Sequence, residues 1–217
     1  MTYLIKVTYL LLPVIFLLQS CSLSPTYFKI GQSVVAGIVG SPHENLSVAE
    51  IDDIKFSFIQ ARIGRGKPVI MILESYSDKG YRWVSGYNEA IETDLSGRVL
   101  RTSGLPHNIN VISDTQGLIF NSLQYPHTRT SSIDFDEPQL SNLFMSSIFL
   151  NRGETEKCFL FETKGSKCIE IVETFHAELI GWRGDNTYLL DPISYDIVST
   201  VTSIHPFLPK LTIRFYL

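Results

Sequence analysis

Turn-forming residues recur about every ten positions along most of this chain, and this spacing most strongly constrains how it can fold. The segments between the turns are rich in Val, Ile, Thr, Tyr and Phe, which favour strands. We expect strands at residues 57–64, 69–75, 81–85, 89–95, 98–102, 157–161, 167–174, 175–182, 187–190, 197–202 and 210–216. The pattern predicts a mainly β fold: a single-domain antiparallel β-sandwich or barrel-like meander with one or two short helices.

Local signals refine this picture in three places. Ser47 and Glu50 have the spacing of a capping box, which predicts a short helix over residues 48–54. Ser96-Gly97 is suited to a hairpin turn with positive φ, and Lys164-Gly165-Ser166 to a second hairpin. Residues 103–132 contain many turn formers and little periodic pattern, so their structure cannot be assigned from sequence.

The N-terminus has the layout of a secretory signal. Lys6 precedes an apolar run from Val7 to Leu18, which is shorter than the ~20 residues that a membrane-spanning helix needs. The following Leu18-Gln19-Ser20-Cys21 resembles the bacterial lipobox, in which the cysteine is lipidated. Two or three acyl chains on Cys21 would anchor the protein stably, since each buried CH₂ contributes ~0.8 kcal/mol.

These signals divide the chain into three parts. We assign residues 1–20 to a lipoprotein signal peptide, 21–28 to a polar tether and 29–217 to one β domain. Ser22 stands where an Asp would favour retention in the inner membrane under the enterobacterial sorting rule. We therefore expect a lipid anchor in the outer membrane, with the domain facing the periplasm.

The charge balance argues against polyanionic partners. The chain has 18 basic and 22 acidic side chains; Lys6 leaves with the signal, so 17 basic residues remain and the net charge is −5. Such a chain lacks the basic surface that nucleic-acid binding requires.

Two sequence blocks resemble the YjbF/GfcB lipoproteins, which are encoded with exopolysaccharide and group 4 capsule genes of Gram-negative bacteria. The first runs from Trp83 to Leu105 and the second from Glu173 to Pro192. The matched residues are Trp83, Gly97, Arg98, Thr102, Gly104, Leu105, Asn186, Tyr188, Asp191 and Pro192. The resemblance implies a periplasmic β domain that acts in synthesis, assembly or export of a surface polysaccharide.

The chemistry of the matched residues favours a structural role for most of them. Gly97 and Gly104 suit positions of positive φ or close approach, and Trp83 is a large apolar plug whose N–H needs a partner when buried. If instead a ligand is contacted, the best candidates are Arg98, Arg101 and Trp83, since exposed guanidinium groups can bind acidic sugars or a protein partner.

The three cysteines form a simple set once Cys21 is acylated. Cys158 and Cys168 then remain as an even pair in an oxidising compartment, which favours a disulfide across a hairpin. Two separate buried thiols are the alternative.

Motifs of common enzymes are absent from the sequence: there is no Gly-x-Ser-x-Gly, His-Glu-x-x-His, Cys-x-x-Cys or phosphate-binding loop. The five histidines are scattered, and the acidic run 134–137 is expected to be a solvated loop and not a calcium site or a glycosidase pair. We therefore expect no catalytic residue, metal or cofactor. The favoured hypothesis is a non-enzymatic accessory lipoprotein that binds a polysaccharide or an export-machinery protein; a periplasmic glycan-processing hydrolase is the alternative.

Overall fold

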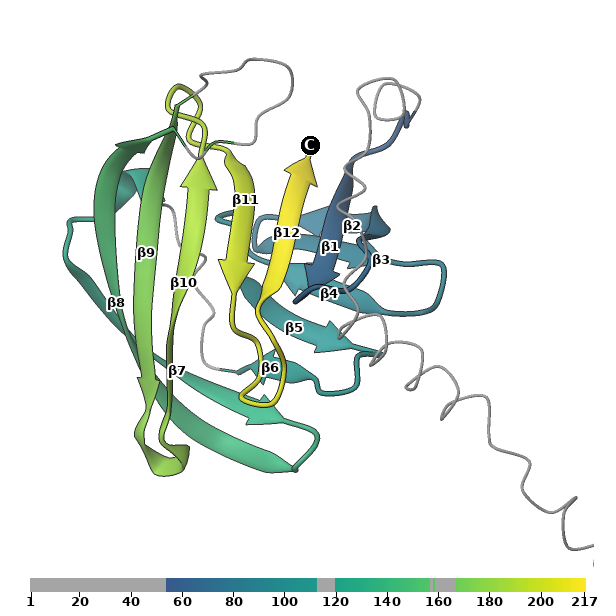
Figure 1. The fold of residues 1–217 in the computed structure, drawn as a ribbon, viewed down its shortest axis with the longest axis vertical. Helices are drawn as coiled ribbons and strands as arrows, with labels where there is room; N and C mark the ends of the chain where they lie inside the picture. The colour runs from purple at the N-terminus through teal and green to yellow at the C-terminus, as the bar shows by residue number, and fades with distance from the viewer. Residues whose placement is uncertain (1–53, 113–119, 157, 159–166) are drawn as a thin grey trace, which may run out of the picture. The chain divides into compact units, whose positions relative to one another are not determined.

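The computed structural model describes residues 54–112, 120–156, 158 and 167–217. Twelve strands and two 3-10 turns make up this part of the chain (Figure 1). They are β1 (Phe58–Ile63), β2 (Val69–Ser77), β3 (Gly80–Val84), β4 (Ala90–Thr93), β5 (Val99–Ser103), β6 (Ile109–Val111), η1 (Phe120–Ser122), β7 (His127–Phe135), β8 (Leu140–Thr155), β9 (Cys168–Ala177), η2 (Glu178–Ile180), β10 (Trp182–Leu190), β11 (Ile197–Thr202) and β12 (Leu211–Tyr216). The described residues include no helix long and apolar enough to cross a membrane.

The strands form a closed antiparallel barrel in chain order. Each strand pairs with the next, and β12 closes the barrel on β1 through a register that runs from Phe58 opposite Tyr216 to Ile63 opposite Leu211. Closure gives each described strand a neighbour on both sides, so none of them forms an open sheet edge that could pair with another chain. The predicted mainly β fold is confirmed, and the barrel is the arrangement that forms.

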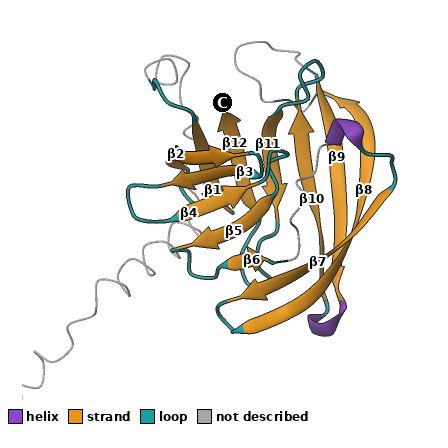
Figure 2. Ribbon diagram, turned by 180° about the vertical axis from the view of Figure 1, so that it is seen from behind, coloured by secondary structure: helices purple, strands orange, loops and turns teal. Residues whose placement is uncertain are grey.

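The barrel interior contains one apolar core. Side chains alternate inward and outward along the strands, as on β12, where Leu211, Ile213 and Phe215 are buried. A barrel of twelve strands is wider than a barrel of eight strands, whose interior side chains alone can fill. Part of the space is filled by Phe120 of η1, whose ring lies 5.1 Å from that of Tyr188 and 6.1 Å from that of Phe149, centroid to centroid. Figure 2 shows η1 and η2 at opposite ends of the long strands.

The boundaries of several strands differ from the sequence prediction. The predicted strand over 175–182 is wrong, because β9 ends at Ala177 and a 3-10 turn intervenes before β10 begins at Trp182. Gly181 closes that turn at φ 63°, and Leu179 within it is 82% exposed. The separate strands expected at 167–174 and 187–190 are therefore parts of the longer β9 and β10.

Three strands were not foreseen. β6 and the start of β7 lie in the segment that the sequence left unassigned, and β8, the longest strand, had no predicted counterpart. The acidic run 134–137 is only in part a loop, because Asp134 and Phe135 belong to β7. The helix expected over 48–54, except for its last residue, and the strand expected over 157–161, except for Cys158, fall outside the described residues. Cys21 and the proposed domain start at residue 29 also fall outside them.

Candidate functional site

The β4–β5 turn is built around Asp94. Its Oδ1 accepts hydrogen bonds from the backbone N–H groups of Ser96 and Arg98, each 2.9 Å long. Gly97 has φ 75°, and a Cβ at this position would lie 2.5 Å from Cγ1 of Ile197 on β11. The turn therefore packs so closely against β11 that only glycine fits.

This packing buries Arg98, which is 4% exposed. Its Nη2 donates to Oγ of Ser131 on β7 over 3.5 Å. Arg129 lies two positions earlier on the same strand; burial lowers its pKa, Arg98 lowers it further, and the carboxylates of Asp94 and Glu173 oppose this. Two arginines and two acids thus lie within electrostatic range of one another.

Glu173 on β9 is the second acid, and none of its surface is exposed. Its Oε2 accepts hydrogen bonds from Nδ2 of Asn186, 2.8 Å away, and from the hydroxyl of Tyr188, 2.7 Å away, both on β10. Burial raises the pKa of Tyr188 well above its usual value, and the negative charge of Glu173 raises it further. Asn186 also accepts a hydrogen bond from the backbone N–H of Ser203, 2.8 Å away, which ties β10 to the chain after β11.

We call this group the buried charged cluster. Its members are the buried residues Asp94, Arg98, Ser131, Glu173, Asn186 and Tyr188, together with the half-buried Arg129. Five of them belong to the two blocks that carried the family resemblance: Asp94 and Arg98 come from the first, and Glu173, Asn186 and Tyr188 from the second. Blocks far apart in the sequence therefore meet inside the barrel. The cluster contains charges of both signs, and these stabilise the fold only while all partners are present, because removal of one leaves an uncompensated buried charge.

The other motif residues of the first block hold the local backbone. Trp83 is fully buried and its Nε1 donates to Oγ1 of Thr93 over 3.2 Å. Thr102 accepts a hydrogen bond from the backbone N–H of Ile109 (3.1 Å), which helps to place β6. Gly104 has φ 78°, and a Cβ there would lie 2.9 Å from the carbonyl oxygen of Asn88. The next residue, Leu105, packs against the core and donates its N–H to Oδ1 of Asn108 over 3.1 Å.

In the second block, Asp191 shapes the turn between β10 and β11. Its Oδ1 accepts hydrogen bonds from the N–H groups of Ile193 (2.8 Å) and Ser194 (2.9 Å), which lower the pKa of this carboxyl. Pro192 sits inside this turn, where its missing N–H breaks no sheet bond.

The prediction of an exposed Arg98 is wrong, because the residue is buried and its guanidinium donates to Ser131 inside the barrel. Trp83 is likewise inside the core and presents no surface to a ligand. Arg101 is exposed, but on the outer face it lies opposite Glu92, which already accepts a hydrogen bond from Arg82 (2.6 Å). Of the three suspected contacts, Arg101 alone is accessible.

Sequence reasoning missed Arg129 and Ser131 because their segment gave no strand signal. Glu173, by contrast, could have been found from the sequence, because it stands between Ile171 and Phe175 at an inward position of an alternating strand. A carboxylate at such a position needs a buried partner.

Cys158 and Cys168 form the predicted disulfide, with Cα atoms 5.2 Å apart. Cys168 packs with Leu189 and Val198 in a small apolar cluster separate from the main core. No group of three or more His, Cys, Asp or Glu residues suited to a metal ion occurs in the described part of the chain.

The fold and the cluster define a closed antiparallel β-barrel protein whose buried charged cluster lies inside the barrel. Residues 31–215 match the model of the YjbF family, described as group 4 capsule polysaccharide lipoprotein GfcB, YjbF. The chain belongs to this family. Its fold resembles the crystal structure of the hypothetical lipoprotein YmcC from Escherichia coli K12, with a TM-score of 0.67 and 17% identity over 79% of this chain and 89% of that one. No curated protein matches the sequence.

Proposed function

We propose that the protein is an outer-membrane lipoprotein that serves as a non-enzymatic accessory in capsule or exopolysaccharide assembly or export. Membership of a capsule polysaccharide lipoprotein family over residues 31–215 is the observation that carries the proposal. The lipid on Cys21 would hold the barrel at the membrane on its periplasmic side. Binding of a polysaccharide or of an export-machinery protein would then be its contribution.

The state of the buried acids supports a non-enzymatic role. A glycosidase uses two carboxyl groups that face each other across an open substrate site. Asp94 and Glu173 are instead enclosed, 1% and 0% exposed, and one oxygen of each is committed: Oδ1 of Asp94 to the turn backbone and Oε2 of Glu173 to Asn186 and Tyr188. Their arrangement is that of a structural support.

A deletion strain tests the proposal. We expect loss of the gene to reduce surface polysaccharide, and a plasmid copy of the wild-type gene to restore it. A matched copy carrying Cys21→Ala should fail to restore it although the protein is made. Unchanged surface polysaccharide in the deletion strain would contradict the proposal.

A second measurement addresses the hydrolase alternative. Purified protein incubated with the polysaccharide of its own strain should release no new reducing ends. Their appearance, and their loss on substitution of an exposed carboxylate, would replace the accessory function with a catalytic one.

A further inference from the structure

Six aromatic rings form a continuous ladder from the core to the surface at one end of the barrel. Neighbouring ring centroids are 4.6, 5.5, 4.5, 4.5 and 5.9 Å apart. In order from the core the rings belong to Phe175, Trp182, Phe135, His205, His107 and Phe207. We call this series the aromatic ladder. The imidazoles of His205 and His107 are stacked nearly parallel, with 8° between their planes.

Three connections that are distant in sequence hold the outer end of the ladder. His107 lies between β5 and β6, and its Nδ1 donates to the carbonyl oxygen of Glu137 in the β7–β8 turn over 2.8 Å. In the β11–β12 connection, the N–H of Phe207 donates to Nδ1 of His205 over 3.2 Å. These bonds fix the positions of the rings before any ligand arrives, which lowers the entropy lost on binding.

The neighbouring Asp136 is committed to the same scaffold. Its Oδ1 accepts the backbone N–H of Asn108 (2.7 Å) and its Oδ2 accepts Nδ2 of the same residue (2.6 Å). These bonds lower the pKa of the carboxyl, although partial burial opposes them. The next residue, Glu137, is exposed, and its carboxylate is accessible to a ligand at this end.

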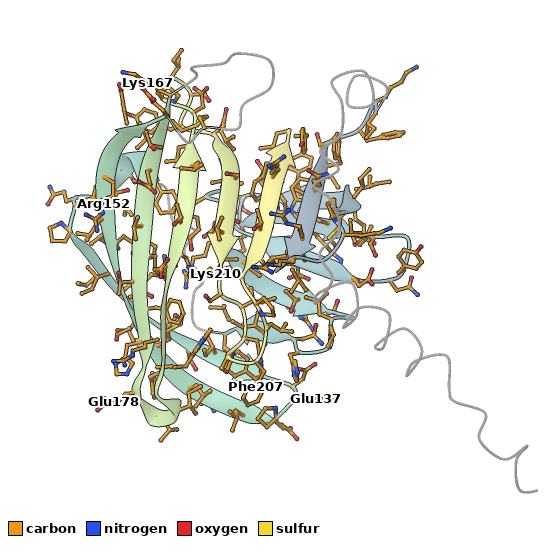
Figure 3. All side chains as sticks on the ribbon, viewed as in Figure 1. Glu137, Arg152, Lys167, Glu178, Phe207 and Lys210 are labelled. Carbon is orange, nitrogen blue, oxygen red and sulfur yellow. A yellow bond between two sulfur atoms is a disulfide. The ribbon has the colours of Figure 1, made fainter. Side chains whose placement is uncertain are left out.

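The ladder ends in an exposed apolar ring. Phe207 is 67% exposed, whereas His205 beneath it is 1% exposed. His107 contacts the Phe207 ring and the Glu137 backbone, and Figure 3 labels Phe207 and Glu137 at the same end of the barrel. A largely exposed aromatic ring is thus held against His107, which in turn is bonded to the backbone of the exposed Glu137. With Nδ1 of His107 donating to that backbone, Nε2 of His107 and the side chain of Glu137 are the acceptors that these residues offer to a ligand.

We propose that Phe207, His107 and Glu137 form a binding platform for uncharged hexose units of a polysaccharide. The proposal deepens the proposed function and rests on it. The face of a phenyl ring carries partial negative charge, which attracts the C–H groups on the apolar face of a pyranose. Hydroxyl groups at the sugar's rim donate to the carboxylate and the imidazole. A uronic acid would meet the like charge of Glu137 and the net negative charge of the protein, so the platform selects neutral sugars.

Phe207→Ala and a matched control test the platform. Phe144 on the outer face of β8 is 71% exposed, so Phe144→Ala removes the same side chain at a similar exposure elsewhere. The probe is the exopolysaccharide extracted from the strain that encodes the protein, used as isolated and after chemical reduction of its carboxyl groups. Affinity of the full-length protein in detergent is measured by calorimetry, with circular dichroism to show that each variant is folded.

We expect Phe207→Ala to weaken binding about tenfold, Phe144→Ala to leave it unchanged, and Phe207→Trp to retain it. Carboxyl reduction of the polymer should preserve or strengthen binding. Equal affinity of Phe207→Ala and wild type would overturn the platform but leave the accessory function standing. Binding that disappears after carboxyl reduction would overturn the assignment to neutral sugars. A wild-type protein that binds neither polymer would also overturn the platform, whereas the deletion strain decides the accessory function separately.

Discussion

Glu173 is the residue on which the buried charged cluster depends. Replacing it with Ala leaves Arg98 enclosed with one acid fewer and removes the acceptor of Asn186 and Tyr188. Because an uncompensated buried charge is costly, we expect Glu173→Ala to lower the free energy of unfolding by about 3–5 kcal/mol, as measured by urea denaturation. Glu170, which lies on the opposite face of β9, provides the control, and Glu170→Ala should change stability by less than about 0.5 kcal/mol. Similar losses in the two variants would contradict the role of the cluster.

Gly97 tests the fit of the β4–β5 turn against β11. Gly97 and Gly153 both have positive φ, 75° and 81°, but a Cβ would meet Ile197 at the first position and nothing within 4 Å at the second. Gly153→Ala should therefore cost only the backbone strain, about 1–2 kcal/mol, whereas Gly97→Ala adds an overpacking cost of about 1–3 kcal/mol. Equal melting temperatures for the two variants would show that the turn can move away from β11.

The type of an individual residue predicted its conformation better than it predicted its environment in the fold. Gly97, Gly104 and Trp83 have the positive φ values or the burial that their side chains suggested. Arg98 does not have the expected exposure, since Ser131, to which its guanidinium donates, comes from a strand distant in the sequence. Arginine is mostly exposed in proteins, and only the three-dimensional pairing overrides that tendency.

Among the elements, β8 shows why some strands are invisible to pattern analysis. Its inward positions include Leu143, Met145 and Phe149, but Phe144 and Ile148 on the outward face are apolar too. Apolar residues on both faces remove the alternation that marks a strand with one solvated side. The boundary between β9 and β10 was missed for the opposite reason, because Phe175, Ala177 and the exposed Leu179 continue the alternation of a strand into the turn.

The disulfide joins the start of β9 to the chain that follows β8. Cys158 and Cys168 are separated by 10 residues, so the crosslink restricts a short loop in the unfolded chain and should contribute about 2.5 kcal/mol. We expect dithiothreitol to lower the denaturation midpoint of the wild-type protein accordingly. Cys158→Ala supplies the control, because reductant should not change its midpoint further. A midpoint indifferent to reductant in the wild type would show that the loop is constrained by other contacts.

The stacked histidines make the loops at the ladder end sensitive to pH. Burial lowers the pKa of His205 below 6.5, the nearby charge of His107 lowers it further, and Asp136 opposes both. The unfolded chain therefore binds a proton more readily than the folded one, so this contribution to stability is complete above about pH 6.5 and is lost as pH falls from there through the lower pKa of the folded state.

We expect the free energy of unfolding to fall between about pH 8 and about pH 5.5, and to fall less in His107→Gln, whose amide can still donate to Glu137. His176 lies exposed on the outer face of β9, outside this contact, and His176→Gln controls for the loss of a histidine as such. A pH profile of His107→Gln that coincides with that of the wild type would contradict the coupling of the two rings.

At the scale of the whole molecule, sequence could not choose between a sandwich and a barrel. The choice depends on whether the first and last described strands pair, and neither β1 nor β12 has a residue that specifies the other as its partner. The structure closes them along six residue pairs. Closure in turn encloses the interior in which the two motif blocks meet, so the cluster could not be derived without it.

The proposed lipid anchor concerns the whole molecule, and in this proposal it depends on Cys21. We expect metabolic labelling with an alkyne palmitate to mark the wild-type protein in the outer-membrane fraction. Cys21→Ala removes the acylated thiol, so label and outer-membrane recovery should both be lost, because the barrel has no acyl chain to bury. Ser22→Asp should keep the label but shift the protein to the inner membrane under the enterobacterial sorting rule. Labelled Cys21→Ala protein would contradict lipidation at this position, whereas Ser22→Asp protein that stays in the outer membrane would contradict only the sorting assignment.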